Sequence, residues 1–160
     1  MPNSIALLLS QLDQAYDRRS WHGPNLRGSL RGVTPAQAAW RPAARRHNIW
    51  ELAVHAAYWK YAVRRRLAGE KRGSFVLKGS NFFARPTEMT AAAWKHDLAL
   101  LESSHRALRE AIAGLSERDL ARVPAGGSFS VLGMVQGIAA HDLYHAGQVQ
   151  LLKRLMAASI

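Results

Sequence analysis

The sequence contains no cysteine. This absence excludes a disulfide framework, a cysteine nucleophile and every metal site built on thiolate ligands. Any metal ion would have to be bound by histidine, aspartate or glutamate. Internal repeats and low-complexity segments are also missing, and 160 residues are enough to bury one sizeable core. We therefore expect one domain that spans residues 1–160.

Acidic residues are scarce: 11 Asp and Glu stand against 22 Lys and Arg, which gives a net charge of +11. Such a balance suits nucleic acid, an anionic membrane surface or an acidic substrate. The densest basic groups are Arg64–Arg66 with Lys71 and Arg72, and Arg41 with Arg45 and Arg46. Because the charges are scattered and no nucleic-acid-binding motif accompanies them, we expect a solvated surface and no nucleic-acid partner.

Long hydrophobic runs are missing as well. The apolar run in MPNSIALLLSQLDQ is too short to span a bilayer, and it lacks the basic segment and cleavage site of a signal peptide. We therefore expect a cytoplasmic protein that has no membrane partner.

Apolar residues recur at helical spacing in four segments and predict four long helices. The segments are residues 4–19, 48–69, 90–114 and 130–157. Asn48 with Glu51 forms a predicted capping box, and Gly69 a predicted helix end. A second capping box, TPAQ at Thr34, predicts a short helix in the first connection, and SERD at Ser116 predicts a further turn. Since no strand alternation occurs, we expect an all-α four-helix bundle with short helical segments in the first connection.

Two histidines, His141 and His145, lie four residues apart in AAHDLYHAGQ and share a helix face with Ile138 and Leu152. Buried imidazoles need partners, because an unsatisfied buried polar group costs about 1–3 kcal/mol. His55 lies on the apolar face of the second long helix, where it alone would suit a core residue. Helical bundles build metal sites from facing helices, so the three histidines together predict one.

Three neutral imidazoles would leave the charge of a divalent ion uncompensated and one coordination position open. Such a site suits the activation of water, a thiol or a carbonyl. Zinc and nickel both suit imidazole ligands, and the sequence does not choose between them. The segment HDLYH differs from the zincin signature H-E-x-x-H, because Asp142 stands where the glutamate would be, so we do not expect a protease.

Five further residues are candidates for the surroundings of this site. Glu51 could orient His55 or simply complete the capping box, and Asp142 could support a ligand or lie on the surface. Gln148 could contact a water or substrate at the metal, or be an ordinary polar residue at the edge of the apolar face. His22 could line the mouth of a pocket or shuttle protons, since the usual histidine pKa is about 6.5. His105 is expected to be a core residue bonded to a backbone carbonyl rather than a fourth ligand.

Four tryptophans accompany these residues. We expect them to pack in the core and at its rim rather than to form a stacking platform for bases: Trp21, Trp50, Trp59 and Trp94.

The segments HNIWELAVHAAYWKYAVRRRLAGE and HDLYHAGQVQLLKR, with WHGPNL and VTPAQ before them, resemble the DinB/YfiT-like superfamily. The resemblance covers nearly the whole chain. It implies a four-helix bundle, often a homodimer, with one divalent metal ion, zinc or nickel, bound by His55, His141 and His145. Some members are transferases or isomerases that use low-molecular-weight thiols. One common family form reads H-H-R-G-Q where this chain has Tyr144 to Gln148, so substrate contacts made there by the missing His or Arg are not implied.

Three functions compete at this point. The first is a metal-dependent enzyme of the transferase or hydrolase type, which acts on a small molecule such as a low-molecular-weight thiol or an anion. The second is a non-catalytic, stress-related module that binds a metal or a ligand. The third, a basic protein associated with nucleic acid, has only the net charge and the arginine clusters in its favour. The residues that would carry out catalysis are unknown from the sequence.

Overall fold

The computed structural model describes residues 3–158, so both ends of the predicted 1–160 domain lie outside it. Within this range the chain forms helices and no strands, which confirms the all-α prediction. The elements are α1 Ser4–Tyr16, α2 Leu26–Leu30, α3 Pro35–Ala39, α4 Ile49–Leu67, α5 Ala91–Ala113, the 3₁₀ helix η1 Glu117–Ala121, and α6 Val131–Ala158.

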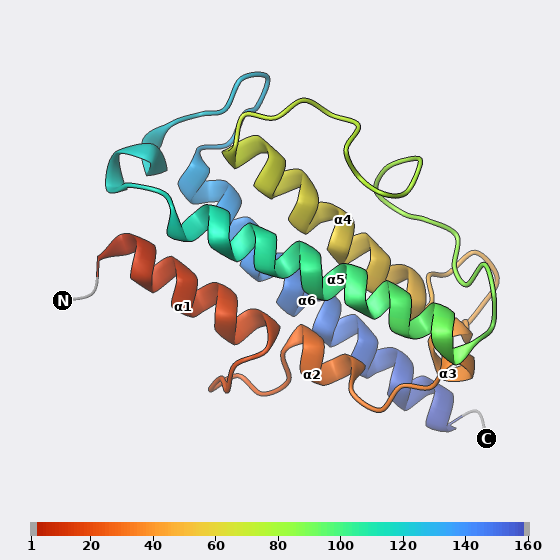
Figure 1. Cartoon of the computed structure of the whole chain (residues 1–160). Coiled ribbons are helices and arrows are strands. Elements are labelled where there is room, and N and C mark those ends of the chain that lie inside the picture. The colour runs from red at the N-terminus through yellow and green to blue at the C-terminus, as the bar shows by residue number, and fades with distance from the viewer. Residues whose placement is uncertain (1–2, 159–160) are drawn as a thin grey trace.

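The four long helices form a bundle in which α4 packs against α5 and α6, and α1 packs against the same two helices from the other side. The connection between α4 and α5 returns along the length of the bundle, so α5 starts near the end where α4 starts (Figure 1). Consequently α4 and α5 run in one direction, and α1 and α6 in the other. The short helices α2 and α3 occupy the first connection, as predicted, and α2 packs against α6.

Local sequence signals account for most helix boundaries. The predicted capping boxes at Thr34, Asn48 and Ser116 are all present, and Gly69 follows the end of α4 in the left-handed region with φ 70°. One boundary differs: α1 ends at Tyr16, earlier than predicted, because the backbone leaves the helical region at the next residue.

Two groups of buried apolar residues fill the bundle, one on either side of its middle. Trp50 and Trp94 contact each other in one of them, with ring centroids 5.0 Å apart. Trp59 is half-buried, whereas Trp21 is fully exposed, so the expectation that all four tryptophans pack at the core was wrong for Trp21. Its place in the irregular chain after α1 explains this, because no helix holds it against the bundle.

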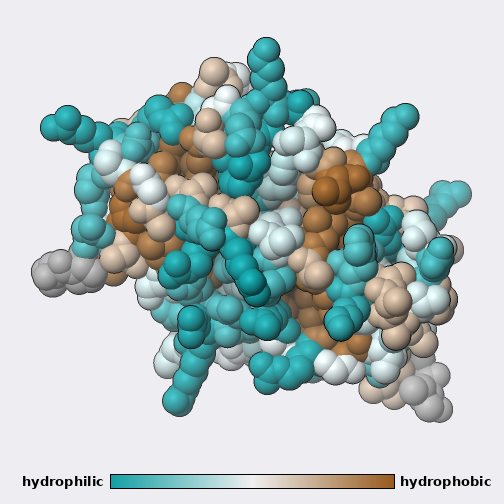
Figure 2. Space-filling model, viewed as in Figure 1, coloured by the Kyte–Doolittle hydropathy of each residue, from teal (hydrophilic) through white to brown (hydrophobic). Residues whose placement is uncertain are grey.

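Hydrophilic side chains cover most of the face shown in Figure 2, and the hydrophobic areas between them are separate. None of the helices between residues 3 and 158 has both the length and the apolar character that crossing a membrane requires.

Candidate metal centre

The fold brings His55, His141 and His145 together at the interface of α4 and α6. The Nε2 atom of His141 lies 3.1 Å from Nε2 of His55 and 3.0 Å from Nε2 of His145. His55 and His145 are buried and His141 is half-buried. On α6 the four-residue spacing places both rings on the face that α4 contacts, and His55 comes from the middle of α4.

Hydrogen bonds on the outer side of two rings fix which nitrogen carries the proton. Nδ1 of His55 donates to the carbonyl oxygen of Asn81 at 2.9 Å, and Nδ1 of His145 donates to Oε1 of Gln148 at 2.6 Å. In a neutral ring this places the lone pair on Nε2, which points toward the other two histidines. Asn81 has a φ of 67°, a left-handed conformation that asparagine adopts more readily than most residues, and its Oδ1 accepts a bond from Trp59.

The residues fit a divalent cation. His141 carries one proton when neutral and can direct it at only one of its two histidine neighbours. In at least one of these two contacts, therefore, the nitrogen lone pairs of both rings face each other across about 3 Å. A metal ion would accept all three lone pairs. Tetrahedral zinc with Zn–N bonds of 2.0–2.1 Å would separate the nitrogens by about 3.3–3.4 Å, close to the separations observed. Nδ1 of His141 is also buried without a hydrogen-bond partner among the described residues.

Burial keeps these rings neutral. Burial and, to a smaller extent, the neighbouring histidines lower the pKa of His55 to about 4 and that of His141 to about 3. The pKa of His145 is lowered as well, chiefly by burial. At neutral pH the three imidazoles are therefore neutral, the charge state in which histidine binds metals.

An aromatic stack covers one side of the cluster. The ring of Phe82 lies between those of His55 and His47, with centroid distances of 3.9 and 3.7 Å. Phe82 comes from the long connection between α4 and α5, the same connection that supplies Asn81. This connection therefore both orients and shields His55.

A buried charge pair lies next to the cluster. Asp142 follows a ligand of the cluster directly in α6, and its Oδ2 accepts a bond of 2.5 Å from Nζ of Lys60; both side chains are fully buried. Nζ of Lys60 also lies 3.2 Å from Nδ1 of His105 and over the ring of Tyr16. The surface alternative for Asp142 was thus wrong. His105 is a core residue as expected, but its Nδ1 partner is a lysine and not a carbonyl.

The other candidates lie as follows. Glu51 completes the capping box and binds Arg41 in a bidentate pair at 2.6 and 2.8 Å, and it bonds to His47 rather than to His55. Gln148 contacts a ligand ring itself, as described above. His22 is exposed and lines a shallow pocket against the outer face of α6, apart from the three histidines.

Lys60, Asn81 and Phe82 were missed by the sequence analysis. Lys60 is one of several basic residues in α4, and nothing in the pattern marks it as buried. Asn81 and Phe82 belong to a segment without periodicity, and only an unusual concentration of aromatic residues there could have drawn attention to it.

An all-helical bundle with three convergent histidines on two facing helices defines a class of helical proteins with a candidate metal site. The family model of the DinB superfamily matches residues 11–149, and the chain belongs to this superfamily. The match includes all three histidines and confirms the resemblance seen in the sequence. No curated protein and no solved structure matches the chain.

Proposed function

We propose that the protein is a metal-dependent enzyme of the transferase or hydrolase type, which binds one zinc or nickel ion through His55, His141 and His145. The observation that supports this most directly is the convergence of three Nε2 atoms. In two of the rings, those of His55 and His145, a hydrogen bond from Nδ1 leaves the lone pair on Nε2. A divalent ion held there would supply Lewis acidity toward a water, a small thiol or a carbonyl group.

The protein's own residues would keep that acidity high. The donor set contains no carboxylate, so the three ligands add no negative charge. The buried carboxylate of Asp142, which directly follows His141 in the sequence, is neutralised by Lys60. Phe82 shields one side of His55 from water, while Asn81 and Gln148 hold two of the rings in place.

The first test is elemental analysis of protein purified without an affinity tag or chelator. We expect about one equivalent of zinc or nickel in the wild type, lost in His55→Ala, His141→Ala and His145→Ala while the helical circular dichroism persists. His22→Ala is the matched control, because this exposed histidine lies apart from the cluster, and it should retain the metal. A folded wild type that contains no metal would refute the proposal.

A second measurement separates an enzyme from a binding module. In a cobalt-substituted sample, anions such as azide should shift the visible spectrum if the ion has an exchangeable position, as catalysis requires. A spectrum that no anion or thiol changes would instead favour a structural metal and the non-catalytic module.

A further inference from the structure

A cavity of about 530 Å³ opens beside the candidate metal centre and shares His145 and Gln148 with it. Its size lies within the range of small-molecule sites. Its walls come from the C-terminal half of α6, the first turn of α4, the loop before α4 and, through Phe82, the connection between α4 and α5. Most of its wall is apolar and includes Pro42, Ala43, Leu52, Phe82, Leu151 and Leu152.

The charged lining of this cavity is basic. Arg46 and His47 line it, and none of its lining residues in the described chain is a carboxylate. His47 is occupied by its bond to Glu51 and its stack on Phe82. The guanidinium group of Arg46 makes no hydrogen bond or ion pair with any residue between 3 and 158, so it is available to an anionic group.

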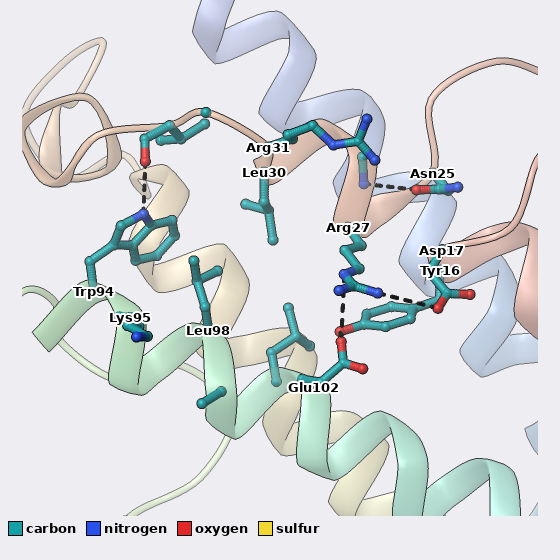
Figure 3. Close-up of a pocket in the computed structure, with 15 residues that line it drawn as sticks. Tyr16, Asp17, Asn25, Arg27, Leu30, Arg31, Trp94, Lys95, Leu98 and Glu102 are labelled. Carbon is teal, nitrogen blue, oxygen red and sulfur yellow. Dashed lines mark hydrogen bonds and ion pairs between the residues drawn. The ribbon is translucent and has the colours of Figure 1, made fainter. Parts of the chain in front are cut away.

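A larger cavity, of about 720 Å³, differs from this one in its charge and in its distance from the metal centre (Figure 3). It lies between α2 and α5, and none of the three histidines lines it. Its central cation, Arg27, already lies 3.5 Å from Asp17 and 3.7 Å from Glu102, and Glu102 also accepts a bond from Tyr16. By size alone this cavity would be the preferred candidate for a ligand site. However, its cation Arg27 is already paired and it lies apart from the three histidines, so the smaller cavity is the better candidate for the site beside the metal.

From these observations we propose that the cavity beside His145 binds the substrate, and that the substrate is an organic anion with an apolar body. This rests on the proposed function, since the cavity matters for catalysis only if the histidines bind a metal. The apolar body lies against Leu52, Leu151 and Leu152, the anionic group pairs with Arg46, and the reacting end lies toward His145.

Straight-chain carboxylates test the proposal by isothermal titration calorimetry on zinc-loaded protein. Each fully buried methylene strengthens binding by about fourfold. Because the cavity is open on one side, octanoate should bind about tenfold or more tightly than butanoate. Octylammonium, of equal length and opposite charge, should show no saturable binding. Equal affinities for butanoate and octanoate would mean that only the carboxylate binds, and would overturn the proposal.

Variants locate the site. Arg46→Gln should weaken octanoate binding about threefold to fivefold, as expected for an exposed ion pair, and Arg46→Lys should restore most of it. Leu151→Ser should reduce the increase in affinity from butanoate to octanoate. Arg31→Gln, a matched change in the larger cavity, should leave binding unchanged. Loss of binding in Arg31→Gln but not in Arg46→Gln would assign the ligand to the other cavity.

Metal content is measured on every sample, which separates the two proposals. A metal-free wild type would refute the metal centre, and the chain-length series on that same protein would still decide whether the cavity binds apolar anions.

Discussion

Removal of one partner of the buried Lys60–Asp142 pair should destabilise the fold strongly. The pair has a separation of 2.5 Å and no exposure to solvent. At an effective dielectric constant of about 20, the attraction between unit charges at this distance is roughly 7 kcal/mol, most of which offsets the cost of removing both groups from water. Burial lowers the pKa of Lys60 and raises that of Asp142, and each charge opposes the shift of its partner.

In Asp142→Leu the ammonium of Lys60 would remain buried without its counter-ion. Breaking a buried pair in this way costs about 3–5 kcal/mol, a large part of the 5–15 kcal/mol that stabilises an ordinary domain. For a chain of this length the midpoint of thermal unfolding should fall by about 6–20 °C. Lys60→Met should be destabilised similarly, because it leaves the carboxylate buried.

The double variant Lys60→Met/Asp142→Leu has no buried charge and should recover most of the lost stability. The assay is urea denaturation of the metal-free wild type, both single variants and the double variant, analysed as a double-mutant cycle. Glu70→Gln, which breaks an exposed pair with Arg64, should leave the midpoint unchanged. Single variants that lose less than about 1 kcal/mol, or a double variant as unstable as the sum of both, would refute the reasoning.

Three further predictions concern the histidines and their neighbours. Gln148→Leu should raise the dissociation constant for zinc about tenfold to a hundredfold, measured by competition with a chromophoric chelator, whereas Gln150→Leu should not change it. Burial lowers the pKa of His55 to about 4 and that of His141 to about 3. Zinc affinity, measured by equilibrium dialysis, should therefore stay nearly constant from pH 8 to about 6. A steep fall of the affinity already in that range would contradict this. Burial raises the pKa of Glu51, but hydrogen bonds from Arg41 and His47 outweigh this effect and hold that pKa at about 2. The carboxylate therefore stabilises the fold above about pH 4.5 and loses this effect as the pH falls toward 2. Glu51→Gln should therefore lose about 1–3 kcal/mol at pH 7 and approach the wild type in acid; a loss that does not depend on pH would refute the assignment.

The helices could be predicted from the sequence because their signals are local. A capping box such as that of Asn48 and Glu51 involves residues three apart, and the same contacts form wherever the helix lies in the fold. The end of α1 was harder to predict, since apolar residues continue to recur near it while the backbone turns at Asp17 to lead the chain toward α2.

The ligands of the candidate site could also be predicted, because helix geometry fixes the directions of their side chains. A four-residue step keeps His141 and His145 on one face of α6, and a bundle brings that face against α4. The groups that orient the rings are different. Asn81 lies 26 residues from its partner His55, in a segment whose path depends on the whole fold, so no sequence spacing indicates the contact.

The same limit applies to Asp142, whose charge affects the electrostatics of the site. From the sequence, a carboxylate beside a predicted ligand could either support the site or face solvent. The structure gives it a buried ammonium as partner, 82 residues away in the chain. Because Lys60 balances this charge within the core, the carboxylate adds little net negative potential at the three histidines. An ion bound there would be surrounded by neutral imidazoles and would retain most of its positive charge, so the buried pair maintains the electrophilic character that the proposed reaction requires.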